Sequence, residues 1–81
     1  MKITIESTSR VVNLYDKNRQ QIAPARIWEG VTEKGARVVA VIARVTTDEP
    51  DPVKLYEFEQ DLIETKPPSA FAEAIPLRFI L

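Results

Sequence analysis

The acidic residues Glu57, Asp61 and Glu64 form one group whose types and spacing could do chemistry. They are four and three positions apart, so a helix would place their carboxylates on one side. Such carboxylates can exchange protons with a substrate or hold a hard cation. The same spacing is also typical of the solvated face of an amphipathic helix, or of an acidic surface that mimics nucleic acid toward a basic protein partner.

A second group combines an aromatic ring with positive charge. Arg26 and Trp28 are two positions apart, and Arg44 joins them if the segments that hold them form a β-hairpin. The Trp28 ring could stack on a nucleobase while the two guanidinium groups pair with phosphate. These three residues are therefore a candidate site for a nucleotide-like ligand.

Strand patterns account for the first half of the chain. Residues 2–15 are rich in β-branched side chains, but the phase of their alternation changes, which predicts a bulge at residues 7–9. Residues 22–31 and 36–47 predict two more strands. Pro24 favours an edge position or a strand start, since proline cannot donate to a ladder.

The loop between the second and third strands determines which residues share a face. If Glu33-Lys34-Gly35 is the loop, with Gly35 in the left-handed position, Thr32 faces Ala36 and the register of the hairpin follows. One face is then apolar and suited to receive a helix: Ala23, Ala25, Ile27, Val31, Val39, Val41, Ala43 and Val45. The opposite face, named here the Trp28 face, holds Arg26, Trp28, Gly30, Val38, Ala40, Ile42 and Arg44.

The Trp28 face is apolar at its centre, whereas a solvated sheet face would alternate to polar residues. Something is therefore expected to cover it. Three occupants are open: the chain's own N- or C-terminal segment, a second copy of the chain, or a ligand with a flat part and an anionic part. A homo-oligomer is expected, and ligand pockets often form between subunits.

The second half of the chain predicts one helix and one more strand. Asp51 followed by Pro52 is a helix start, and apolar residues recur at helical spacing until about Thr65. One short helical turn at residues 69–74 and a strand at residues 75–81 follow. The expected fold is a single α+β domain over residues 1–81, in the order β-β-β-α-β, with an antiparallel sheet and one helix packed on one face.

Composition narrows the classes of function. The chain has no histidine, no cysteine and only two glycines, so the commonest general base, the best nucleophile and a phosphate-cradling loop are missing. We therefore expect no enzyme, no cofactor and no metal site. A pI of about 5.4 disfavours direct nucleic-acid binding. The sequence shows no signal peptide and no apolar run long enough for a membrane, so a cytoplasmic protein is expected.

Charge is divided unevenly along the chain. Residues 1–47 carry eight cations and four anions, whereas residues 48–81 carry three cations and eight anions. This asymmetry indicates either a basic binding surface backed by an acidic one, or a basic sheet that lies against an acidic helix with self-complementary charge.

Three short runs support a resemblance to a known group of proteins. They are Ala25–Gly30 followed by Thr32-Glu33 and Gly35, then Pro68-Ser69-Ala70, and the ending Pro76–Leu81. With them the chain resembles small uncharacterised proteins encoded by prophages and tailed bacteriophages. The resemblance supplies no site residues.

The resemblance implies a setting in the bacterial host cell. There, a small non-catalytic protein would act against host defence, by sequestering a nucleotide or by blocking a host protein complex. A structural or assembly component of a phage particle is one alternative, and a small carboxylate-dependent enzyme is another.

Overall fold

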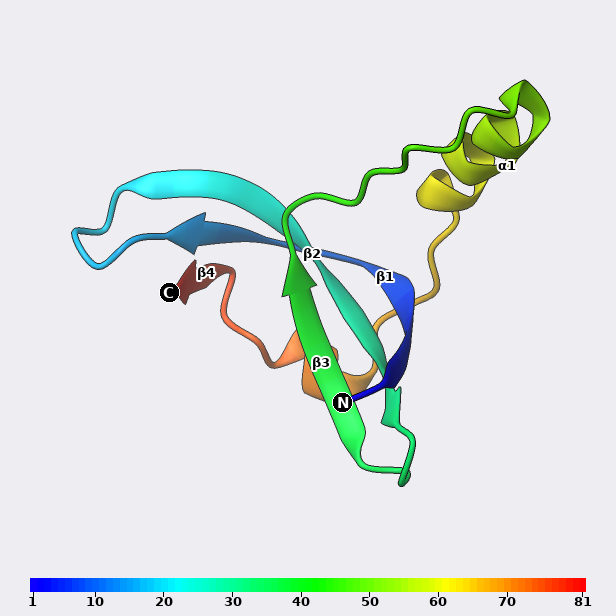
Figure 1. Cartoon of the computed structure of the whole chain (residues 1–81). Helices are drawn as coiled ribbons and strands as arrows, with labels where there is room; N and C mark the ends of the chain where they lie inside the picture. The colour runs from blue at the N-terminus through cyan, green and yellow to red at the C-terminus, as the bar shows by residue number, and fades with distance from the viewer.

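The computed structural model describes all 81 residues, which form one four-stranded sheet and two helices (Figure 1). Along the chain, the elements are β1 (Ile3–Tyr15), β2 (Gln21–Thr32), β3 (Arg37–Ile42), α1 (Pro52–Ile63), α2 (Ala70–Glu73) and β4 (Arg78–Ile80). The strand order is β3-β2-β1-β4. The α+β class is confirmed. The sheet is mixed rather than antiparallel, because the chain crosses over through both helices before β4 joins β1 in parallel.

The β2–β3 hairpin has the predicted register. Arg26 faces Ile42 and Trp28 faces Ala40, and the Thr32 amide donates to the Ala36 carbonyl at 2.9 Å. Gly35 has a φ of 87°, the left-handed conformation expected of it. β3 ends at Ile42, earlier than predicted. Residue 44 would have faced Pro24, which has no N–H to donate to a ladder.

The predicted bulge in β1 is present and also anchors a distant segment. The register with β2 shifts between Ser7 and Val11. At this irregularity the amide of Lys66 donates to the Ser7 carbonyl at 3.1 Å, and the Ser9 amide donates to the Lys66 carbonyl at 2.9 Å. The chain that leaves α1 is therefore tied to the middle of β1.

The core lies on the sheet face that the sequence assigned to it. Its buried apolar side chains are Val12, Leu14, Ala25, Ile27 and Ala72, and Val39, Val41, Ile75 and Phe79 pack against them half-buried. One helix does cover this face, but it is the short α2, which contributes Ala72, rather than α1.

The longer helix α1 begins as predicted but does not contribute to the core. The Asp51 carboxylate accepts a hydrogen bond from the Val53 amide at 2.9 Å, and Pro52 is the first helical residue. No residue of α1 is buried, and the helix extends away from the sheet (Figure 1). The pairing of Lys66 with β1 explains this position, because it fixes the chain only three residues after the helix ends. Neither helix has the length and apolar character needed to cross a membrane.

Candidate functional site

Arg26, Trp28 and Arg44, the predicted ligand-binding residues, line a single hollow of about 290 Å³. β2 supplies Arg26 and Trp28, and Arg44 lies two residues beyond the end of β3. The remaining lining residues are apolar: Val11, Pro24, Ala25, Ile42, Ala43, Val45 and Leu62. The hairpin register therefore brings a ring and two cations together against an apolar wall.

The two arginines of this hollow are held differently. Arg26 is half-buried, and its guanidinium donates to the Thr8 carbonyl at 2.8 Å. That bond positions the group while using only one of the five N–H donors of an arginine. Arg44 is exposed. The hollow thus has one positioned cation and one cation that is free to adjust to an anion.

A second hollow of about 420 Å³ adjoins the first. Trp28, Val45 and Leu62 line both, so they lie between the two. The predicted acidic residues Asp61 and Glu64 line this second hollow, but Glu57, also exposed, does not. In the sequence, Glu57, Asp61 and Glu64 are separate from the Trp28 group, because no local pattern shows that the last turn of α1 approaches β2.

Glu57, Asp61 and Glu64 are not gathered into one group of ligands. Nowhere in the chain do three or more histidine, cysteine or acidic side chains gather as ligands. Three carboxylates, those of Glu6, Asp61 and Glu64, line the second hollow against one cation, Lys66, whereas two arginines and no carboxylate line the first. The charge changes sign across the Trp28 ring.

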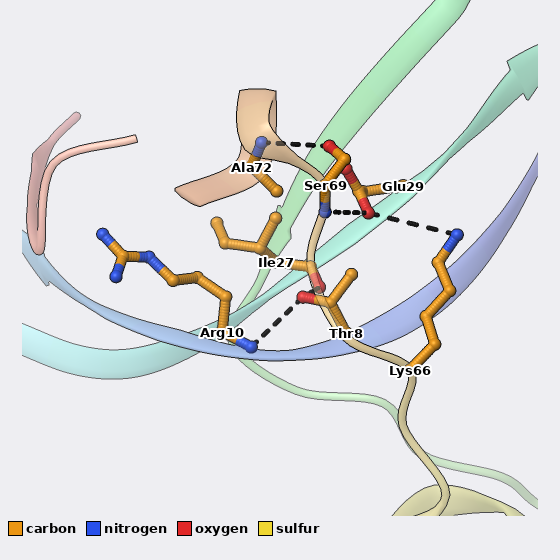
Figure 2. Close-up of polar contacts among 7 residues, drawn as sticks. All are labelled: Thr8, Arg10, Ile27, Glu29, Lys66, Ser69 and Ala72. Carbon is orange, nitrogen blue, oxygen red and sulfur yellow. Dashed lines mark hydrogen bonds and ion pairs between the residues drawn. The ribbon is translucent and has the colours of Figure 1, made fainter. Parts of the chain in front are cut away.

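A polar cluster that the sequence did not predict surrounds Glu29 on the core face (Figure 2). The Glu29 carboxylate accepts hydrogen bonds from the Ser69 hydroxyl and, at 3.2 Å, from the Ser69 amide, and Lys66 Nζ lies 4.0 Å away. The Ser69 hydroxyl also accepts from the Ala72 amide at 3.2 Å as the N-cap of α2. These contacts hold α2 on the sheet. The sequence signal was the short helical turn predicted at residues 69–74, which did not indicate a partner.

The pKa of Glu29 is lowered from its ordinary value of 4.5. The Ser69 hydroxyl bond is the main cause, and partial burial opposes it. The Ser69 amide and the charge of Lys66 lower the pKa further. Because all of these partners favour the ionised carboxylate, this cluster stabilises a contact rather than preparing a proton donor.

A third hollow of about 480 Å³ lies beside the Glu29 cluster, lined by Glu29, Gly30, Val31, Arg37, Val38, Val39, Lys66, Ser69 and Phe71. Glu29 and Lys66 already pair with each other there. Arg37 is the one remaining cation, against two in the Trp28 hollow, and Phe71 supplies the only aromatic ring. This hollow therefore fits a flat anionic ligand less well than the hollow at Trp28.

Thr8 is a buried polar residue that the sequence did not single out. Its hydroxyl donates to the Ile27 carbonyl at 2.7 Å and accepts from the Arg10 amide at 3.2 Å (Figure 2). The Arg10 guanidinium in turn donates to the Ile75 carbonyl at 2.6 Å. Thr8 thereby satisfies the backbone at the bulge of β1, and Arg10 ties that strand to the segment after α2.

No family model, curated protein or solved structure matches this chain. Its function is therefore inferred from its own geometry.

Proposed function

We propose that this protein is a non-catalytic binding protein that takes up a nucleotide-like ligand on the Trp28 face. One observation carries the proposal: Arg26, Trp28 and Arg44 line the same largely apolar hollow. Its volume of about 290 Å³ is close to the roughly 300 Å³ at which small-molecule pockets begin. A ligand of mononucleotide size matches that volume.

Each part of such a ligand has a matching group in the hollow. The Trp28 ring offers a face for stacking, worth about 1–3 kcal/mol per base. Arg26 and Arg44 can donate charge-assisted hydrogen bonds to a phosphate. Asp61 and Glu64, beyond the ring, would repel the phosphate from the second hollow. The ligand is therefore expected to lie with its anionic end toward the arginines.

The residues present support binding rather than turnover. The chain has no histidine and no cysteine, so a proton-transfer or nucleophilic mechanism would have to use carboxylates, lysines or hydroxyls. Glu29, whose pKa is lowered, is held by Ser69 on the opposite face of the sheet. A ligand in the hollow would be held without being converted.

The resemblance to phage-encoded proteins gives this activity a setting. A protein that holds a nucleotide without converting it would lower the free concentration of that nucleotide in the host cell. Sequestration of a nucleotide messenger used in host defence is the role we propose.

Thermal unfolding with and without nucleotides tests this function. The panel is AMP, GMP, CMP, UMP, NAD and a cyclic dinucleotide, with nucleosides and inorganic phosphate as controls that each lack one half of the ligand. A true ligand at 100 times its Kd stabilises the folded state by about 2.7 kcal/mol. We expect a rise in Tm with at least one nucleotide and none with the controls.

Two exposed arginines supply a matched pair of variants. Arg44→Glu should abolish the rise in Tm, measured against the unliganded Tm of the same variant, because it removes one of the two cations that would pair with the phosphate. Arg37→Glu changes the charge equally beside the third hollow and should retain the rise. The proposal would be contradicted if no member of the panel changed the Tm. It would also be contradicted if the Arg37 variant lost the rise in Tm while the Arg44 variant kept it. A Tm that no member of the panel changes is what a purely structural phage component predicts.

A further inference from the structure

Helix α1 has an apolar side that nothing in its own chain covers. Val53, Tyr56 and Ile63 are 65%, 63% and 75% exposed. They are three and seven positions apart, so they form one stripe along the helix. A helix of 12 residues is marginal in water without tertiary packing. The stripe is therefore expected to be covered in the functional protein.

The chain exposes more accessible surface than a typical folded monomer of the same mass. Its accessible surface is 6451 Å², whereas a folded monomer of 9.2 kDa exposes about 4,900 Å². Its radius of gyration is 14.3 Å, against about 12 Å for a compact domain of this length. Only six residues are buried. The excess, about 1,500 Å², is larger than the roughly 800 Å² that each partner buries in a standard interface.

The chain also carries a surface that matches α1. Val38, Ala40 and Ile42 on the Trp28 face are only half-buried, and β3 is an edge strand with one open side. Arg26 and Arg44 give this face positive charge. The helix has one cation, Lys54, against three anions: Glu57, Glu59 and Asp61. An acidic apolar helix and a basic apolar sheet face are complementary.

Within one chain, α1 is not placed to cover the Trp28 face. The Ser7 hydroxyl donates to the Glu64 carbonyl at 2.8 Å, and Lys66 pairs with β1, so the end of the helix is fixed at that strand. From there α1 runs away from the sheet (Figure 1). The residues of α1 that line a hollow together with Trp28 are Phe58, Asp61 and Leu62. The stripe of Val53, Tyr56 and Ile63 is left to another molecule.

We infer that the occupant is a second copy of this chain, and that the protein is a two-fold dimer in which α1 of each copy packs on the Trp28 face of the other. Each copy supplies one helix and one sheet face, so a two-fold axis satisfies both at once and leaves no open end. The Trp28 hollow then lies at the interface, with the partner's helix as a further wall. This inference stands on exposure, area and charge, and it does not depend on the identity of a ligand.

Cross-linking between two differently substituted chains tests the inference. Because the natural chain has no cysteine, single cysteines can be placed by Tyr56→Cys on α1 and Ala40→Cys on β3 without side reactions. The two variants are mixed and treated with a short bismaleimide. A mixed product of one chain of each kind is expected, whereas pairing Ala40→Cys with Lys17→Cys, in the distant β1–β2 turn, should give none. Absence of the mixed product from folded chains would overturn the inference.

A pair of surface substitutions gives a second, independent readout. Tyr56→Ser and Phe71→Ser each remove an aromatic ring of similar exposure, 63% and 67%, but Phe71 lies on α2 at the opposite face of the sheet. Sedimentation should show a dissociation constant at least tenfold higher for the Tyr56 variant and an unchanged one for the Phe71 variant. If the wild-type protein is monomeric at micromolar concentration, the inference is overturned. Helix α1 would then be expected to bind a different protein that has a basic surface. Equal weakening by both variants overturns the assignment of α1.

Discussion

At the scale of single residues, Glu29 joins two parts of the chain that are 40 positions apart. We predict that Glu29→Gln destabilises the protein by about 1.5–3 kcal/mol at pH 7, the usual range for a hydrogen bond to a charged group. The folded-state pKa of Glu29 lies below 4.5, so its contribution is complete above that pH and is lost as the pH falls through the lowered pKa. Urea unfolding at pH 7 and pH 3 should show a difference from wild type at the first pH and a smaller one at the second.

Glu33 provides a control for that experiment. Its side chain is 66% exposed, and its nearest cation is Lys2 at 3.9 Å. Exposed pairs of this kind contribute little to stability, so Glu33→Gln should behave as wild type at both pH values. A constant effect of Glu29→Gln across the pH range would show that the carboxylate charge is not what holds α2.

Thr8 supports a second prediction at this scale. Valine has nearly the same shape but no hydroxyl, so Thr8→Val leaves the Ile27 carbonyl without that donor and the Arg10 amide without its acceptor in a buried place. We expect a loss of about 1–3 kcal/mol in the free energy of unfolding. Thr46→Val, at an exposed position, should change it by less than about 0.5 kcal/mol. Equal effects of the two substitutions would contradict the role given to the Thr8 hydroxyl.

At the scale of elements, the two glycines of the β2–β3 hairpin differ in what they allow. A Cβ on Gly30 would lie 1.7 Å from the Thr4 carbonyl oxygen of β1, so the strands would have to separate. A Cβ on Gly35 meets open space, and only the φ of 87° opposes it. Gly35→Ala should therefore cost about 1–2 kcal/mol. Gly30→Ala should cost more or prevent folding, as thermal unfolding would show; a smaller effect at Gly30 would contradict the observed strand spacing.

The hairpin was predictable because its information is local. A glycine in the loop and the alternation of apolar residues fix the pairing of β2 with β3, and the Trp28 group follows from that register. The cap at Asp51 and the bulge in β1 were predictable for the same reason. Each depends on residues only a few positions apart.

The placement of the two helices was not predictable in this way. Two contacts join residues that are far apart in the sequence: that of Ser69 with Glu29 and that of Lys66 with Ser7. No repeating pattern of residues predicts either contact. The sequence showed a long amphipathic helix and a bare core face, so packing one on the other was the simplest expectation. The capped turn of α2 took that place, with Ala72 in the core.

At the scale of the whole molecule, pairing of two copies would explain both the uneven charge and the large exposed area. The acidic half of the chain includes the exposed α1, and the basic half includes the Trp28 face. If these surfaces meet between copies, their attraction is partly screened by salt. We predict that the dimer dissociation constant rises between 50 mM and 500 mM NaCl, as sedimentation would measure. A salt-independent constant would indicate that the apolar stripe alone holds the copies together.

Native mass spectrometry of the intact protein, with and without the nucleotide panel, tests most directly that the Trp28 face is a binding face shared by two copies. We predict a species of two 9.2 kDa chains that gains the mass of a nucleotide, and that keeps its two chains but not the added mass when Trp28 is replaced by alanine. Single chains at micromolar concentration would contradict the pairing. Paired chains that gain no mass from any nucleotide would contradict the ligand, and single chains without added mass would contradict the account as a whole.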